Sequence, residues 1–249
     1  MSSVANLSVD ARPSVFAIWF QAIRPATLPA AVAPVALGAA LAVGDGVFSA
    51  MPALVALLGA LLIQIGTNLA NDYFDFKKGA DTEDRLGPAR VTQRGWISPA
   101  AVAWATAIVF ALAIASGLYL YAVAGWQILT LGLVSVLCGV AYTGGPWPLA
   151  YVGLGDVFVL VFFGPVAVAG TYFVQALSWS PKAMLAALPV GLLMTAILVV
   201  NNLRDRHTDA VAGKRTLAVR FGERFTRLEY TVLVAGAYLW LAGLVAAGV

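Results

Sequence analysis

Two clusters of carboxylates and amides stand at the ends of long apolar runs in this sequence. Their members are Asn71, Asp72, Asp75 and Asp81 after the run 52–70, and Asp205 and Asp209 after the run 184–200. A carboxylate at the edge of a hydrocarbon layer is costly, so acids in such places usually mark a functional site. Because lysines and arginines flank both clusters, the pattern predicts divalent cations that hold a phosphorylated substrate.

The spacing within each cluster places oxygen ligands on one helical face. Asn71 and Asp75 are one helical turn apart, and so are Asp205 and Asp209. Mg²⁺ prefers oxygen ligands and is typically bound by one or two carboxylates plus substrate phosphates. We therefore predict a Mg²⁺ site between the two clusters. The alternative is that these acids are solvated helix ends paired with neighbouring basic residues.

Basic residues near the two clusters supply the positive charge that a diphosphate requires. Lys78, Arg85 and Arg90 follow the first cluster, and Arg204 and Lys214 surround the second. Arginine binds phosphate through two hydrogen bonds and lysine acts as a point charge, so these five residues are the predicted diphosphate contacts. The alternative is that they only satisfy the excess of basic residues found in cytoplasmic loops.

Composition defines the class of protein. Hydrophobic residues make up 61% of the 249 residues and charged residues only 11%, with a mean hydropathy of +0.88; soluble domains carry about 25% charged residues. Since a spanning helix needs roughly 20 apolar residues, we predict an all-α polytopic transmembrane bundle forming one domain, residues 1–249. The seven predicted spans are 26–43, 52–72, 100–123, 126–142, 155–176, 184–202 and 229–248.

The sequence supports three further expectations. An amphipathic helix over 15–23 is expected to lie at the membrane interface, just before the first span. No cleavable signal peptide is expected, because residues 1–14 are polar. The single cysteine, Cys138, lies within an apolar run and rules out an intrachain disulfide.

The basic residues also orient the predicted bundle. With seven spans, fourteen lysines and arginines fall on the side shared by the N-terminus and the loops after spans two, four and six, and only Lys182 falls on the other. Cytoplasmic loops carry such an excess of basic residues. The sequence therefore predicts a multi-pass protein of the cytoplasmic (inner) membrane, embedded in the lipid bilayer with both acidic clusters toward the cytoplasm.

Taken in order, the motifs resemble those of the UbiA superfamily of intramembrane aromatic prenyltransferases, and most of all its dihydroxynaphthoate branch. The matching stretches are 24–29, 68–73, 79–81, 85–88, 142–145, 153–156, 162–166 and 201–205. The resemblance implies Mg²⁺-dependent transfer of a polyprenyl group from polyprenyl diphosphate to 1,4-dihydroxy-2-naphthoate, with loss of CO₂, giving demethylmenaquinone. It also implies a metal-binding set of Asn71, Asp72, Asp75, Asp81, Asp205 and Asp209, in which Asp75, Asp205 and Asp209 are catalytic.

The same resemblance implies that four further residues contact the aromatic acid acceptor. They are Arg24, Asn68, Tyr142 and Asp156. Two of them have simpler roles open to them: Arg24 can anchor the chain at the membrane interface, and Asp156 can cap the helix that it begins. No nucleic-acid partner is expected.

Three features depart from the superfamily's pattern. Asp81 lies six residues beyond Asp75 where four is usual, and Pro146 stands where a lysine often follows Tyr142. The family fold has nine transmembrane helices, whereas seven are counted here. Two other functions stay open: a cation transporter, although transporter sites usually lie near the bilayer midplane, and a prenyltransferase for hydroxybenzoate or homogentisate.

Overall fold

The computed structural model describes residues 13–80, 87 and 90–248, and every regular element among those residues is a helix. The elements are α1 (Val15–Ala22), η1 (Pro25–Thr27), α2 (Pro29–Gly44), α3 (Ala50–Lys77), α4 (Pro99–Ala124), α5 (Trp126–Ala141), α6 (Gly155–Val161), η2 (Phe162–Val166), α7 (Ala167–Ala176), α8 (Pro181–Arg204), α9 (Arg206–Val211) and α10 (Leu217–Ala246). The predicted all-α fold is confirmed.

Each of the seven predicted spans coincides with a helix or a broken helix. In the part of the chain that the structure describes, five are long and apolar enough to cross a membrane: α3, α4, the run Gly155–Ala176, α8 and α10. A sixth arises if Val15–Thr27 and α2, which meet at 50°, form one broken span. The 16 residues of α5 fall short of the roughly 20 that a span needs, so the count of seven is approximate.

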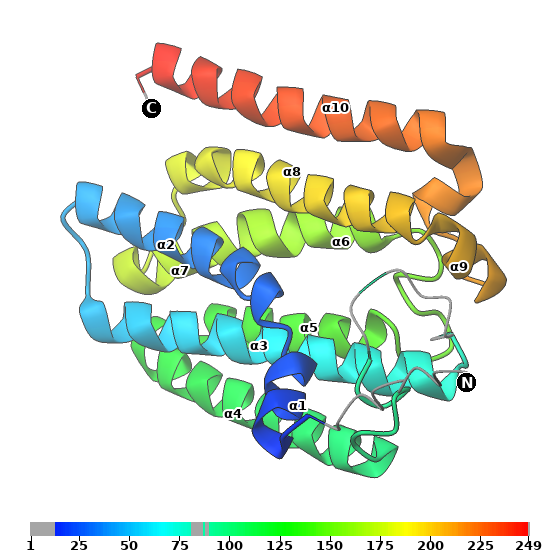
Figure 1. The fold of residues 1–249 in the computed structure, drawn as a ribbon. Helices are drawn as coiled ribbons and strands as arrows, with labels where there is room; N and C mark the ends of the chain where they lie inside the picture. The colour runs from blue at the N-terminus through cyan, green and yellow to red at the C-terminus, as the bar shows by residue number, and fades with distance from the viewer. Residues whose placement is uncertain (1–12, 81–86, 88–89, 249) are drawn as a thin grey trace, which may run out of the picture.

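The helices pack side by side with α3 at the centre of one group and α8 at the centre of another (Figure 1). Helices α4 and α5 pack against α3 and against each other, while α6, η2 and α10 pack against α8. Helices α2 and α7 contact each other and both groups. In Figure 1 the C-terminal ends of α3 and α8 and the short helix α9 lie at the right-hand end of the bundle, so Asp75, Asp205 and Asp209 all belong to this end. We call this the head end.

Local sequence signals explain where several of these helices begin. The side chains of Ser98, Ser180 and Thr216 accept hydrogen bonds from the backbone N–H groups three residues on. Such caps satisfy donors that the first helical turn leaves free. Proline follows Ser98 and Ser180 at the first helical position, where its missing N–H costs nothing.

The span from α6 to α7 is broken in its middle by η2, one turn of π-helix. Gly164 has non-helical dihedral angles (φ −93°, ψ −105°), and Pro165 follows it with no N–H to donate. A Cβ on Gly164 would lie 3.2 Å from the Cα of Gly191 in α8. The two glycines therefore bring η2 and α8 into close contact at this break.

The predicted interfacial helix over 15–23 corresponds to α1. Its Val15 and Phe16 are 73% and 78% exposed, whereas Ile18 and Ala22 are buried against α3 and its neighbours. An apolar face that the protein leaves uncovered beside a buried face fits a helix lying in the membrane interface.

Candidate active site

Asp75 lies near the end of α3, only 1% exposed, and receives side chains from three separate segments. Arg90 Nη2 donates to its Oδ2 at 2.9 Å, and the Tyr151 hydroxyl donates to its Oδ1 at 2.9 Å. Lys214 Nζ lies 3.4 Å from Oδ2. A buried carboxylate needs such charged and hydrogen-bonding partners to offset its desolvation, so the head end is organised around Asp75.

Lys214 joins the two predicted clusters. Its Nζ lies 3.4 Å from Asp75 Oδ2 and 3.6 Å from Asp209 Oδ1. Because one ammonium contacts both of them, these two carboxylate oxygens lie close to each other. The prediction that the first and second clusters face one site is supported by this contact, with a lysine ammonium between them.

Asp205 occupies the same end of the bundle with a partner of its own. Arg204 Nε and Nη2 donate to Asp205 Oδ1 and Oδ2 at 2.8 Å and 2.7 Å, a bidentate pair. The Asp209 N–H donates to the Asp205 carbonyl oxygen at 2.8 Å. The two acids thus stand one helical turn apart, as their spacing predicts, although α8 ends at Arg204 and α9 begins at Arg206.

Tyr151 contacts the residues of the predicted site, although no pattern in the sequence selects it. Besides donating to Asp75, its ring lies beneath two ammonium groups, 4.6 Å from Lys78 Nζ and 5.1 Å from Lys214 Nζ. The Tyr151 carbonyl accepts from the Arg215 N–H at 2.9 Å, which ties the loop after α5 to the loop before α10. No spacing rule links Tyr151 to Asp75, 76 residues away.

Lys78 lies against the loop after α5. It follows the last residue of α3, and its Nζ donates to the Thr143 carbonyl oxygen. Partial burial lowers the pKa of Lys78 from its ordinary value, the nearby Asp75 carboxylate acts in the opposite direction, and Lys214 lowers it further. Lys78, Lys214 and the Tyr151 ring therefore form one cationic group beside Asp75.

Asp72 holds backbone N–H groups of the segment that follows the first acidic cluster. It is 2% exposed, and its Oδ2 and Oδ1 accept from the N–H groups of Val91 and Thr92 at 3.1 Å and 3.2 Å. Both carboxylate oxygens therefore hold the turn that precedes α4. The prediction that Asp72 binds metal stays a prediction, and the structure adds these two backbone contacts to it.

The remaining first-cluster and basic residues are placed as follows. Asn71 Oδ1 accepts from the Thr143 hydroxyl at 2.8 Å, so this amide faces the loop after α5. Arg90 is 4% exposed and forms its ion pair with Asp75, which makes it a partner of the acid as well as a candidate diphosphate contact. The predicted ligand Asp81 and the predicted diphosphate contact Arg85 lie outside the described residues.

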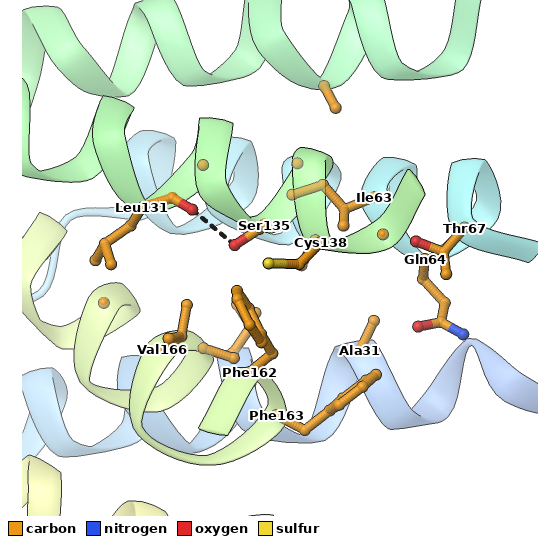
Figure 2. Close-up of a pocket in the computed structure, with 18 of the residues that line it drawn as sticks. Ala31, Ile63, Gln64, Thr67, Leu131, Ser135, Cys138, Phe162, Phe163 and Val166 are labelled. Atoms are coloured by element: carbon orange, nitrogen blue, oxygen red, sulfur yellow. Dashed lines mark hydrogen bonds between the residues drawn. The ribbon is translucent and has the colours of Figure 1, made fainter. Parts of the chain in front are cut away.

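A cavity of about 330 Å³ extends from the head end into the bundle. Helices α2 to α7 all contribute to its wall, and Asn68, Asn71 and Tyr142 line its head end. Figure 2 shows Phe162 on one side and Ser135 and Cys138 of α5 on the other. The Ser135 hydroxyl donates to the Leu131 carbonyl oxygen of its own helix at 2.7 Å, so the wall around it presents mainly hydrocarbon.

The four predicted acceptor contacts divide into two pairs. Tyr142 and Asn68 line the cavity. The Asn68 side-chain nitrogen is also used internally, because it donates to the Ile23 carbonyl at 3.0 Å and to the Thr27 hydroxyl at 2.9 Å. Asn68 thereby holds the corner before α2, where Arg24 adopts a left-handed conformation with φ 53°.

Asp156 and Arg24 lie off the cavity wall in this structure. Asp156 is 7% exposed in the first turn of α6, and Leu154, not Asp156, is the residue that caps this helix. Among the described residues its Oδ1 has no hydrogen-bond partner. The capping role therefore does not account for the acid, and its buried oxygen stays available.

The described residues contain no group of three or more His, Cys, Asp or Glu side chains positioned to hold a metal ion. Asp75 and Asp209 provide two carboxylates that already share one cation. Mg²⁺ is commonly bound by one or two carboxylates, with substrate phosphates completing its shell. The described donors at the head end fit that mode of binding.

Comparisons of the sequence with known proteins identify its family. The UbiA prenyltransferase family model matches residues 31–249. The 1,4-dihydroxy-2-naphthoate octaprenyltransferases of Escherichia coli and Bacillus subtilis are 44% and 35% identical to this chain, covering 90% and 95% of it and 75% and 76% of their own lengths. The 2-carboxy-1,4-naphthoquinone phytyltransferase of Synechocystis is 30% identical, over 96% of this chain and 77% of its own.

A solved structure shares the fold. It is a UbiA homologue from Archaeoglobus fulgidus bound to GPP and Mg²⁺, with a TM-score of 0.72 and 18% sequence identity, covering 91% of this chain and 77% of that one. The family match spans almost the whole bundle, including both acidic clusters and the residues that line the cavity. This chain is therefore a multi-pass membrane enzyme that belongs to the UbiA prenyltransferase family.

Proposed function

We propose that this chain transfers a polyprenyl group from polyprenyl diphosphate to 1,4-dihydroxy-2-naphthoate, with Mg²⁺ as its cofactor and with loss of CO₂. The observation that carries the proposal is the Lys214 ammonium shared by Asp75 and Asp209 at the head of an apolar cavity. The names of the relatives from Escherichia coli and Bacillus subtilis support the donor and acceptor. The family assignment leaves no support for the cation-transporter alternative.

The head end is suited to hold a diphosphate together with a divalent cation. Asp75 and Asp209 are the proposed metal ligands, with Asp205, Asn71 and Asp81 as further candidates. When bound, Mg²⁺ would neutralise the negative charge that develops on the departing diphosphate. The Archaeoglobus fulgidus relative, solved with GPP and Mg²⁺, supports this pairing of cofactor and substrate.

The protein's own cations contribute to the same step. Lys78 and Lys214 sit over the Tyr151 ring, within reach of the Asp75 carboxylate, and Arg90 approaches that carboxylate from the other loop. As the C–O bond of the donor breaks, its electron pair goes to the diphosphate. Fixed cations in a partly buried site stabilise that charge without having to reorganise.

The cavity suits the other half of the reaction. Breaking the C–O bond leaves an allylic cation, which water would capture if it had access. A cavity walled by apolar helices excludes water, so the ring carbon that bears the carboxylate can supply the electron pair for the new C–C bond. The bond from that carbon to the carboxylate then breaks, its electron pair returns to the ring, and CO₂ leaves. Tyr142 and Asn68, which line the cavity, are proposed acceptor contacts, and Asp156 and Arg24 are further candidates.

The proposed location is the cytoplasmic membrane of a bacterium, with the head end toward the cytoplasm. The excess of lysines and arginines in the head-end loops supports this orientation.

A product assay tests the reaction. Purified protein in lipid nanodiscs is given prenyl diphosphates with dihydroxynaphthoate, hydroxybenzoate or homogentisate, and products are identified by mass spectrometry. We expect a prenylated product from dihydroxynaphthoate that lacks the carboxylate, abolished by EDTA and restored by Mg²⁺. A product that keeps the carboxylate, a product from another acceptor alone, or full activity in EDTA would contradict the proposal.

A further inference from the structure

The cavity continues far beyond the part that a diphosphate and an aromatic ring would fill. Its wall runs along α5 from Tyr142 at the head end to Ile128, where Leu120 and Val174 also line it. At about 1.5 Å per residue, this stretch of α5 is roughly 20 Å long. Ile128, Leu120 and Val174 belong to a buried apolar cluster that packs across the deep end of the cavity.

Helix α5 keeps this passage open with small side chains. Its cavity-lining residues include Gly132, Ser135 and Cys138, which recur at helical spacing, while Leu133 and Leu137 on other sides of the helix are exposed. The size of each α5 side chain that faces the cavity therefore sets the width of the cavity at that point between Tyr142 and Ile128.

Two glycines of α5 line the cavity, Gly132 and Gly139, and they differ in the space around them. A Cβ on Gly132 would meet no heavy atom within 4 Å, whereas a Cβ on Gly139 would lie 2.5 Å from Thr67 Oγ1. Gly139 is thus required for helix packing between α5 and α3. At Gly132 the missing side chain leaves open space, roughly 15 Å along α5 from Tyr142.

We propose that Gly132 determines which prenyl donors this enzyme accepts, because the prenyl chain passes it on the way to the deep end of the cavity. The proposal rests on the proposed function, since it assumes that a prenyl diphosphate binds at the head end. The continuity of the wall from Asn71 to Ile128 carries it. A bulky side chain at position 132 closes the cavity beyond that point, so long donors lose their site while short donors keep theirs.

The first experiment compares donors of two lengths. The variants Gly132→Ala, Gly132→Val and Gly132→Phe are assayed with geranyl and geranylgeranyl diphosphate, using the acceptor that the wild-type protein accepts. We expect the ratio of kcat/KM for the long donor to that for the short donor to fall with side-chain size, by roughly tenfold or more for phenylalanine. Gly243→Phe is the matched control, because a Cβ on Gly243 in α10 also meets nothing within 4 Å and lies outside the cavity.

The second experiment needs neither acceptor nor turnover. Cys138 is the only cysteine in the sequence, so in a Cys138→Ala background the variant Ile128→Cys carries one thiol at the deep end. We expect geranylgeranyl diphosphate to protect this thiol from a lipid-soluble methanethiosulfonate, and geranyl diphosphate to protect it much less. In Cys138→Ala, Ile128→Cys, Gly132→Phe, the long donor should no longer protect.

Each outcome decides something. If folded Gly132→Phe keeps the wild-type donor ratio, or if the long donor leaves the thiol at 128 unprotected, the prenyl chain does not pass Gly132 and the inference is overturned. If Gly132→Phe fails to fold, the alanine and valine variants and the labelling at 128 still give the answer. A wild-type protein that transfers no prenyl group, yet shows length-dependent protection, would count against the proposed function alone.

Discussion

Lys214 and Asp75, 139 residues apart in the sequence, form a buried ion pair in which Lys214 Nζ lies 3.4 Å from Asp75 Oδ2. The same ammonium lies 3.6 Å from Asp209 Oδ1. One cation thereby keeps two carboxylates from separate helices, α3 and α9, at one place.

The two carboxylates around Lys214 are expected to be indispensable. Asp75→Asn and Asp209→Asn remove a negative charge with little change in shape, so each should lower kcat/KM by about a hundredfold or more. Turnover is measured by product formation at saturating Mg²⁺, and folding by size-exclusion chromatography in detergent. Asp45→Asn is the control, because Asp45 lies at the opposite end of the bundle and accepts from Tyr172 at 2.7 Å. Wild-type turnover in folded Asp75→Asn would refute the role of this acid.

Tyr151→Phe separates the hydroxyl of this residue from its ring. The variant loses the 2.9 Å hydrogen bond to Asp75 and keeps the ring beneath Lys78 and Lys214. Because a hydrogen bond to a charged group contributes about 1.5–3 kcal/mol, kcat/KM for the donor should fall roughly tenfold or more. Tyr119→Phe, on an exposed part of α4, provides the comparison. Equal activity in the two variants would mean that the hydroxyl does not act on the site.

Asp72→Asn tests whether this acid is structural. An amide keeps one oxygen but turns an NH₂ group toward the N–H of Val91 or Thr92, so the turn before α4 loses a hydrogen bond. A loss of about 1–3 kcal/mol of unfolding free energy is expected, seen as a lower Tm. The Mg²⁺ concentration for half-maximal activity should stay at its wild-type value. An unchanged Tm together with a strongly raised Mg²⁺ concentration for half-maximal activity would instead identify Asp72 as a metal ligand.

Lys78 predicts a pH effect. Because burial lowers its pKa below the ordinary 10.5, Lys78 loses its proton at lower pH than an exposed lysine would. The proposed diphosphate donor then loses one cationic contact. The value of kcat/KM for the donor, which reports on the free enzyme, should therefore decline at a pH below the ordinary lysine pKa of 10.5. Lys78→Arg should shift the decline upward, since arginine stays charged.

The pH profiles of the wild-type protein and of the Lys78 variants test this assignment. Lys78→Met should show a low kcat/KM for the donor without this alkaline decline. Superimposable profiles for the wild-type protein and Lys78→Arg would assign the decline to another group.

Local sequence patterns determined much of the bundle. Apolar runs of sufficient length became helices at all seven predicted places, and Ser98, Ser180 and Thr216 marked helix starts. These features depend on hydrophobicity and on hydrogen bonds within a few residues, which a sequence displays directly. The one-turn spacing of Asp205 and Asp209 survived even the break between α8 and α9 for the same reason.

Which acid faces which partner was decided only by the tertiary structure. Asp72 and Asp75 stand three residues apart on α3, yet one holds the backbone at 91–92 and the other receives Arg90, Tyr151 and Lys214. Helical spacing orders residues around one helix and carries no information about what packs against it. Tyr151 and Lys214 reach Asp75 only because the loops after α5 and α9 fold over the end of α3, so their contribution depends on packing between segments far apart in the chain.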